Sequence, residues 1–121
     1  VTVGGSGYSE FQQYIESGRM RPIAVTSDKR LKGVNVPTLK EQGIDVVLGN
    51  WRGVYGAAGI GDAQRKALVD AIVKATKTKS WQEALDKNGW TPALLTGKEF
   101  EDFVDRDFAG LRATMVKAGM I

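Results

Sequence analysis

Hydrophobic and polar residues follow two different periods along this chain. Apolar side chains recur at the three- to four-residue spacing of an amphipathic α-helix over residues 9–17, 62–77, 80–88 and 97–118. A short helix is expected at 38–42. Mostly apolar segments of strand length occupy 20–26, 44–48 and 90–95. Because these strands alternate with helices, the pattern predicts an α/β fold.

Capping residues define the expected helix ends. A Ser or Thr followed three residues later by Glu or Gln is a capping box, in which each side chain bonds the other residue's backbone N–H. Four such pairs occur: Ser9–Gln12, Thr38–Glu41, Ser80–Glu83 and Thr96–Glu99. Asp62 is the expected start of the helix at 62–77. Three glycines are placed to end helices in the left-handed conformation: Gly18, Gly43 and Gly89.

The last predicted helix has one apolar and one acidic face. Its apolar stripe, together with two tryptophans, is expected to form core: Phe100, Phe103, Val104, Phe108, Leu111, Met115, Trp81 and Trp90. Its carboxylates are expected to form a solvated surface: Glu101, Asp102, Asp105 and Asp107. Because no acid and base are paired, nothing here suggests an enzyme.

Composition argues against several classes of function. The 121 residues suffice for one small domain, and the net charge of +3 is spread evenly, with six Lys/Arg against five Asp/Glu in residues 1–50. Without a basic cluster, nucleic-acid binding is not expected. The absence of Cys and His argues against disulfides, zinc sites and thiol catalysis, and no cofactor or metal is predicted. The chain starts with Val inside an apolar run and shows no signal peptide, which favours a fragment of a longer protein.

The glycine-rich loop Gly4–Ser9 is the first candidate site. A strand, a glycine loop and a helix start would present free N–H groups at the positive end of a helix dipole, which favours a carboxylate or phosphate. The loop lacks the Lys of a phosphate-binding P-loop, and position 10 is Glu rather than the third Gly of a dinucleotide fingerprint. The alternative is a tight turn in which Ser9 only caps its own helix.

Three further polar residues are candidates. Arg52, beside Trp51 in a glycine-flanked break, is suited to clamp a carboxylate, or alternatively to stack on Trp51 at the surface. Thr26 and Ser27 end a predicted strand, where α/β proteins bind ligands, or they form a turn with Asp28. Arg30 is expected to pair with a local acid.

Several motifs together resemble one family. They are Gly18-Arg-Met-Arg-Pro-Ile-Ala-Val25, Lys29-Arg-Leu31, Val36-Pro-Thr-Leu-Lys-Glu-Gln-Gly43, Asn50-Trp-Arg-Gly53, Gly61-Asp-Ala-Gln64, Lys87-Asn-Gly-Trp90 and Gly97-Lys-Glu-Phe100. Over nearly the whole chain, the sequence is similar to the C-terminal part of extracytoplasmic solute-binding proteins of tripartite tricarboxylate transporters, the Bug or TctC type. Family members are considerably longer.

The resemblance implies part of a two-lobe, type II periplasmic-binding-protein-like fold. Residues 1–49 would belong to the second lobe, 50–53 to the interlobe crossing and 54–121 to the first lobe. It also implies a passive receptor in the periplasm of a Gram-negative bacterium, which captures a small organic acid or amino-acid-like solute and presents it to membrane transporter subunits. The expected ligand-binding residues are Ser6, Gly7, Tyr8, Thr26, Ser27 and Arg52.

A second hypothesis is a small, non-enzymatic α/β interaction or structural domain that binds no small ligand. Sheet edges without partners would then make the chain self-associate.

Overall fold

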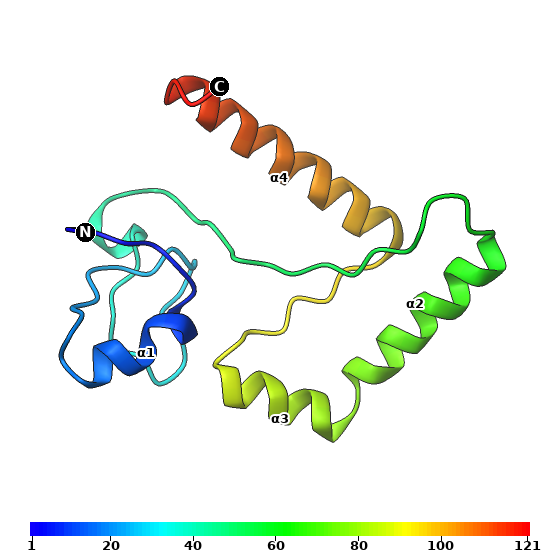
Figure 1. Ribbon diagram of the computed structural model, residues 1–121, viewed down its shortest axis with the longest axis horizontal. Coiled ribbons are helices and arrows are strands. Elements are labelled where there is room, and N and C mark those ends of the chain that lie inside the picture. Colours follow the sequence, from blue (N-terminus) through cyan, green and yellow to red (C-terminus); the bar gives the residue numbers. More distant parts are fainter.

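The computed structural model describes residues 1–121 as helices joined by long extended segments (Figure 1). In chain order the elements are α1 (Tyr8–Glu16), the 3₁₀ helix η1 (Lys40–Gln42), α2 (Asp62–Thr76), α3 (Lys79–Asn88) and α4 (Gly97–Lys117). Every helix expected from the sequence is present within two residues of its predicted bounds. The segment at 38–42 forms a 3₁₀ turn rather than an α-helix.

The predicted β-strands do not form a sheet. The only β-pairing is an isolated parallel bridge between Val25 and Thr38, and the α/β prediction is not met by this structure. In the bridge, the Val25 N–H donates to the Pro37 carbonyl at 2.9 Å and the Leu39 N–H donates to the Val25 carbonyl at 3.0 Å. The segments at 44–48 and 90–95 form no strand, and the first of them contains a tight turn in which the Val46 N–H donates to the Ile44 carbonyl at 2.8 Å. A strand needs a neighbour to complete its backbone hydrogen bonds, and an apolar run alone does not supply one.

The predicted helix caps are partly correct. Thr38 and Glu41 form the full capping box, with the Thr38 N–H donating to Glu41 Oε2 at 2.8 Å and the Glu41 N–H donating to Thr38 Oγ1 at 3.1 Å. The boxes at Ser9 and Ser80 are wrong, since α1 and α3 begin earlier, with Gly7 and Thr78 as N-caps.

The remaining helix starts also differ in detail from the sequence prediction. Thr96 occupies the N-cap position of α4 but makes no cap bond, and Asp62 is the first residue of α2, not its cap. All three predicted terminal glycines, Gly18, Gly43 and Gly89, have positive φ, as expected.

One aromatic cluster holds the middle of the chain to α4. The indole of Trp51 packs edge-on against Phe103 at 5.3 Å and against Phe100 at 6.0 Å between ring centroids. Its Nε1–H donates to Asp107 Oδ2 at 2.9 Å. Asp107 is therefore half-buried and bonded, and its predicted place on a solvated face is wrong. Tyr55 contacts Phe100 from the other side at 5.7 Å. The extended segment that leads from η1 to α2 passes beneath the N-terminal half of α4 (Figure 1).

Most of the remaining apolar surface is uncovered. Only Val36, Thr38 and Leu85 are buried, and the accessible surface is 10111 Å². A compact monomer of this 13.1 kDa mass would expose about 6,400 Å². The predicted core role is wrong here for five residues, because helical spacing predicts which face is apolar but not what packs against it. They are Phe108 (69% exposed), Leu111 (44%), Trp90 (42%), Trp81 (41%) and Met115 (36%). No helix has the length and apolar character needed to cross a membrane.

Candidate functional site

The N-terminus of α1 carries no side-chain cap. Gly7 occupies the N-cap position with φ −59° and ψ 139°, and no side chain accepts from the first-turn N–H groups. The Glu10 N–H donates to the Gly7 carbonyl at 3.0 Å, whereas the N–H groups of Gly7, Tyr8 and Ser9 make no hydrogen bond and remain available to an acceptor from outside. Ser9 lies within the first turn and does not cap the helix, so the cap predicted for it is wrong. The Ser6 hydroxyl instead donates to the carboxylate of Glu10.

A second segment approaches this helix start. The segment Asn50–Gly53, here called the crossing segment, follows the expected strand at 44–48. A Cβ placed on Gly7 would lie 3.3 Å from Asn50 Nδ2. That separation is tighter than ordinary van der Waals contact, so the absence of a side chain at Gly7 lets Asn50 approach the backbone closely. The glycine loop and the crossing segment, more than 40 residues apart in the sequence, therefore meet at the start of α1.

Trp90 connects Arg52 to the same helix. The guanidinium carbon of Arg52 lies 4.6 Å from the centre of the Trp90 ring, a cation–π geometry. The indole Nε1–H of Trp90 donates to Ser9 Oγ at 3.4 Å. Arg52 thus stacks on Trp90 and not on the neighbouring Trp51. It takes part in none of the ion pairs of the chain, which leaves its N–H donors free.

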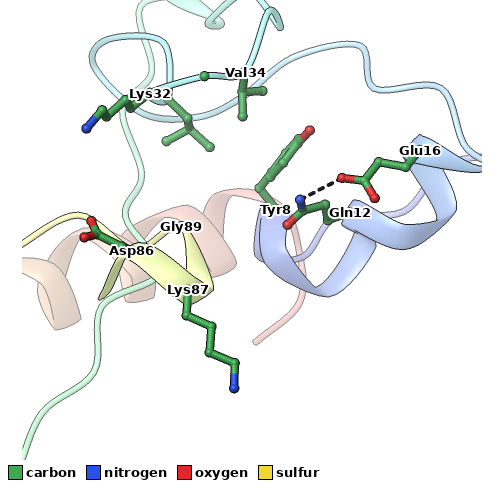
Figure 2. Close-up of a pocket in the computed structure, with 10 residues that line it drawn as sticks. Tyr8, Gln12, Glu16, Lys32, Val34, Asp86, Lys87 and Gly89 are labelled. Atoms are coloured by element: carbon green, nitrogen blue, oxygen red, sulfur yellow. Dashed lines mark hydrogen bonds between the residues drawn. The ribbon is translucent and has the colours of Figure 1, made fainter. Parts of the chain in front are cut away.

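Tyr8 faces a different space. It lines a hollow of about 270 Å³ between α1, the loop at 31–34 and the C-terminal end of α3. Figure 2 shows its ring between α1 and the loop that carries Lys32 and Val34. The same view shows the ammonium groups of Lys32 and Lys87 pointing away from each other, so they do not converge on one ligand. The structure therefore separates Tyr8 from the group formed by Gly7, Asn50 and Arg52.

The side-chain hydroxyls of Thr26 and Ser27 both donate hydrogen bonds to backbone carbonyls. Thr26 Oγ1 donates to the Leu48 carbonyl at 2.7 Å, and the Leu48 N–H donates back to the Thr26 carbonyl at 2.9 Å. Ser27 Oγ donates to the Lys29 carbonyl at 2.6 Å and closes a turn. Thr26 therefore fixes the chain two residues before Asn50, whereas Ser27 shapes its own turn.

Two ion pairs hold the loop that follows. Arg30 donates to Glu41 through Nε and a terminal nitrogen, at 3.0 and 2.8 Å, which confirms its predicted pairing with a local acid. Hydrogen bonds from Arg30 and from the Thr38 N–H lower the pKa of Glu41 to about 2. Lys40 donates to Asp28 at 2.6 Å, and this bond lowers the pKa of Asp28 and raises that of Lys40. These pairs brace the loop, and Arg52 takes part in neither of them.

The group at the start of α1 is rich in hydrogen-bond donors. No cluster of three or more carboxylates is close enough to hold a metal ion. Uncapped N–H groups, the Asn50 amide and the Arg52 guanidinium are all hydrogen-bond donors, and such donors bind anionic oxygen. Glu10 lies within this group and opposes an anion there. Sequence reasoning treated Ser9 only as a helix cap and missed Glu10 and Trp90, because periodicity does not reveal which residues far apart in the chain meet.

Nearly the whole of this chain is similar to parts of known proteins. Residues 6–119 match the sequence profile of a family described as "Tripartite tricarboxylate transporter family receptor". A curated relative, "UPF0065 protein in gbd 5'region" from Cupriavidus necator, is 28% identical over 108 residues, covering 88% of this chain and 33% of the relative. The crystal structure of a TctC solute binding protein from Polaromonas, without ligand, superposes with a TM-score of 0.63 at 33% identity. That superposition covers 90% of this chain and 38% of the solved one. The chain spans about a third of the length of these relatives.

Proposed function

Since the chain belongs to the family of tripartite tricarboxylate transporter receptors, we propose that it contributes one side of a site that captures a small carboxylate for a membrane transporter. Members of this family are extracytoplasmic solute-binding receptors and not enzymes. The solute, a small organic acid or amino-acid-like molecule, would be delivered unchanged to the transporter's membrane subunits in a Gram-negative periplasm. Residues 1–49 and 54–121 would lie in different lobes, with the crossing segment between them.

This proposal rests on one observation, the unpaired guanidinium of Arg52 beside the start of α1. Its guanidinium is held over Trp90 with no internal ion pair, beside the uncapped N-terminus of α1. An arginine in this state offers two parallel N–H groups that match the two oxygens of a carboxylate. The free N–H groups of Gly7, Tyr8 and Ser9 would bind a second acceptor of the same solute. Ser6 and Thr26 support the two segments, and Tyr8 would contact a solute that extends into the neighbouring hollow.

The test is a binding titration of the protein against citrate, succinate, glutamate and nicotinate, by calorimetry at low ionic strength. We expect Arg52→Ala to weaken the tightest of these about tenfold or more, since a hydrogen bond to a charged group is worth about 1.5–3 kcal/mol. Arg19→Ala is the matched control, because Arg19 also stacks on an aromatic ring, Tyr14, at 5.6 Å but lies at the far end of α1. Equal losses in the two variants, or no binding of any probe, would refute the proposal.

Glu10 gives a second, opposite test. Its carboxylate would repel the anion at the helix start, so Glu10→Gln should tighten binding of the same probe. Glu16→Gln is the control, since Glu16 lies on the last turn of α1 and accepts from Gln12 at 2.8 Å. Weaker binding in Glu10→Gln would argue against an anion at this position.

A different function is favoured by one observation, the large exposed apolar surface. The exposed half of the α4 stripe and the unpaired segments at 44–48 and 90–95 would then be covered by a second copy of the chain. Light scattering separates the two hypotheses. A concentration-dependent dimer without affinity for any carboxylate supports this second function, and a monomer excludes it.

A further inference from the structure

Trp90 touches both halves of the candidate site, the crossing segment and the start of α1. Its ring face lies under the Arg52 guanidinium, at 4.6 Å from the guanidinium carbon. Its indole N–H reaches Ser9 in the first turn of α1. Because the face and the N–H edge of an indole are different surfaces, both contacts are made at once. With 42% of its surface exposed, Trp90 is not a core residue.

Arg52 has no other anchor. The two residues before it are held, Trp51 against α4 and Asn50 beside Gly7, but these contacts do not fix the Arg52 side chain. An arginine side chain on a fixed backbone still samples many rotamers, which would have to be ordered on binding. The Trp90 ring selects one of them and leaves the N–H edge of the guanidinium free.

The backbone around Trp90 supports this role. The N–H of Trp90 donates to the Leu85 carbonyl at 2.9 Å, and Gly89 before it has φ +63° and ends α3. Leu85 is one of the three buried residues. The Cα of Trp90 is thus fixed to the end of α3, and its side chain projects from there toward α1 and Arg52.

We infer that Trp90 is a positioning residue of the carboxylate site: its ring orients Arg52, and its indole N–H ties that arginine to the first turn of α1. The inference rests on the proposed function for its effect on binding, but the contact itself does not depend on a ligand. The role needs an aromatic face, and the tie to Ser9 also needs the indole N–H.

Two variants distinguish the contribution of the aromatic face from that of the indole N–H. Trp90→Leu removes both the aromatic face and the N–H, whereas Trp90→Phe keeps a face for Arg52. Trp81→Leu is the matched control, because Trp81 is 41% exposed and its ring takes part in no aromatic or cation–π contact. Trp90→Leu should weaken binding of the tightest carboxylate probe about two- to fivefold more than Trp81→Leu, with Trp90→Phe between them.

A double-mutant cycle separates positioning from general damage. If Trp90 acts through Arg52, Trp90→Leu should cause no further loss of affinity in an Arg52→Ala background. The same loss in both backgrounds, or equal effects of Trp90→Leu and Trp81→Leu, would overturn the inference. Urea unfolding of each variant checks that the fold persists.

A ligand-free measurement keeps the inference testable if no probe binds. The Arg52 side-chain protons should show an upfield ring-current shift in NMR spectra of the wild type. That shift should disappear in Trp90→Leu and persist in Trp90→Phe. If no probe binds and the shift is present, the proposed function fails while the positioning contact stands. If the shift is absent from the wild type, the inference is wrong whatever binds.

Discussion

Gly53 ends the crossing segment inside the aromatic cluster, and its replacement by Ala gives a sharp test of that packing. A Cβ at position 53 would lie 2.9 Å from Phe100 Cζ, 3.0 Å from Tyr55 Cε2 and 3.1 Å from Trp51 Cζ3. All three are atoms of aromatic rings that pack on one another, so none can move without disturbing the others. The φ of Gly53 is not positive, and the backbone therefore accepts Ala without strain.

Gly49→Ala supplies the matched comparison. Gly49 lies four residues earlier, also has no positive φ, and its added Cβ would meet nothing within 4 Å. Both substitutions reduce the entropy of the unfolded chain by the same amount, which stabilises by about 0.4–1 kcal/mol where the native site has room. Overpacking costs about 1–3 kcal/mol. Because the entropy gain is common to both, Gly53→Ala should be about 1–3 kcal/mol less stable than Gly49→Ala.

Urea unfolding followed by circular dichroism at 222 nm measures this difference. The unfolding midpoint of Gly49→Ala should lie at or slightly above that of the wild type, and that of Gly53→Ala should lie clearly below both. In thermal unfolding, the two variants should differ by about 4 °C per kcal/mol. A Gly53→Ala midpoint equal to or above that of Gly49→Ala would refute the packing of Trp51, Tyr55 and Phe100 around position 53.

Two further predictions concern local stabilisation. Arg30 and the Thr38 N–H hold the pKa of Glu41 at about 2, below its ordinary 4.5, so the stability this carboxylate contributes is complete above about pH 4.5 and is lost as the pH falls toward 2. Between pH 6 and pH 3, the melting temperature of Glu41→Gln should therefore fall less than that of the wild type. Glu101→Gln, which removes an unpaired carboxylate, should follow the wild type. Parallel plots of melting temperature against pH for the wild type and Glu41→Gln would contradict this prediction. Thr78 Oγ1 accepts from the Trp81 N–H at 3.2 Å, so Thr78→Ala should cost about 1 kcal/mol in urea unfolding. Thr96→Ala, which removes no cap bond, should cost clearly less, and equal costs would mean that the Thr78 bond contributes nothing.

Helix positions could be predicted from the sequence because helix signals are local. The glycines at 18, 43 and 89 end helices through their own backbone conformation, and the Thr38–Glu41 box closes within four residues. The N-caps predicted at Ser9 and Ser80 each lie two residues after the actual ones, Gly7 and Thr78, since Gly and Thr are also accepted at this position and local preference alone does not choose between neighbours.

The β-strands and the site could be predicted only in part, because both depend on distant residues. The apolar run at 44–48 has strand composition, but a strand also needs a partner, and only Val25 and Thr38 found one. Gly7 and Arg52 were named as candidates, and the structure brings their neighbourhoods together through Asn50 and Trp90. Nothing in the local pattern around Trp90 indicates that it lies against Ser9, 81 residues away.

The hydrogen bond from Trp90 to Ser9 closes a loop of 81 residues, and that length sets a limit on what the bond can do alone. Closing a flexible loop of this size costs on the order of 4 kcal/mol, whereas one exposed hydrogen bond returns about 1 kcal/mol. The contact therefore forms only where other ties, such as the one from Trp51 to Asp107, have already shortened the free chain. A solute held by both Arg52 and α1 would act as a reversible cross-link over the same loop. Part of its binding free energy would then be used to order the N-terminal residues. This ordering would slow hydrogen exchange at the amides of α1.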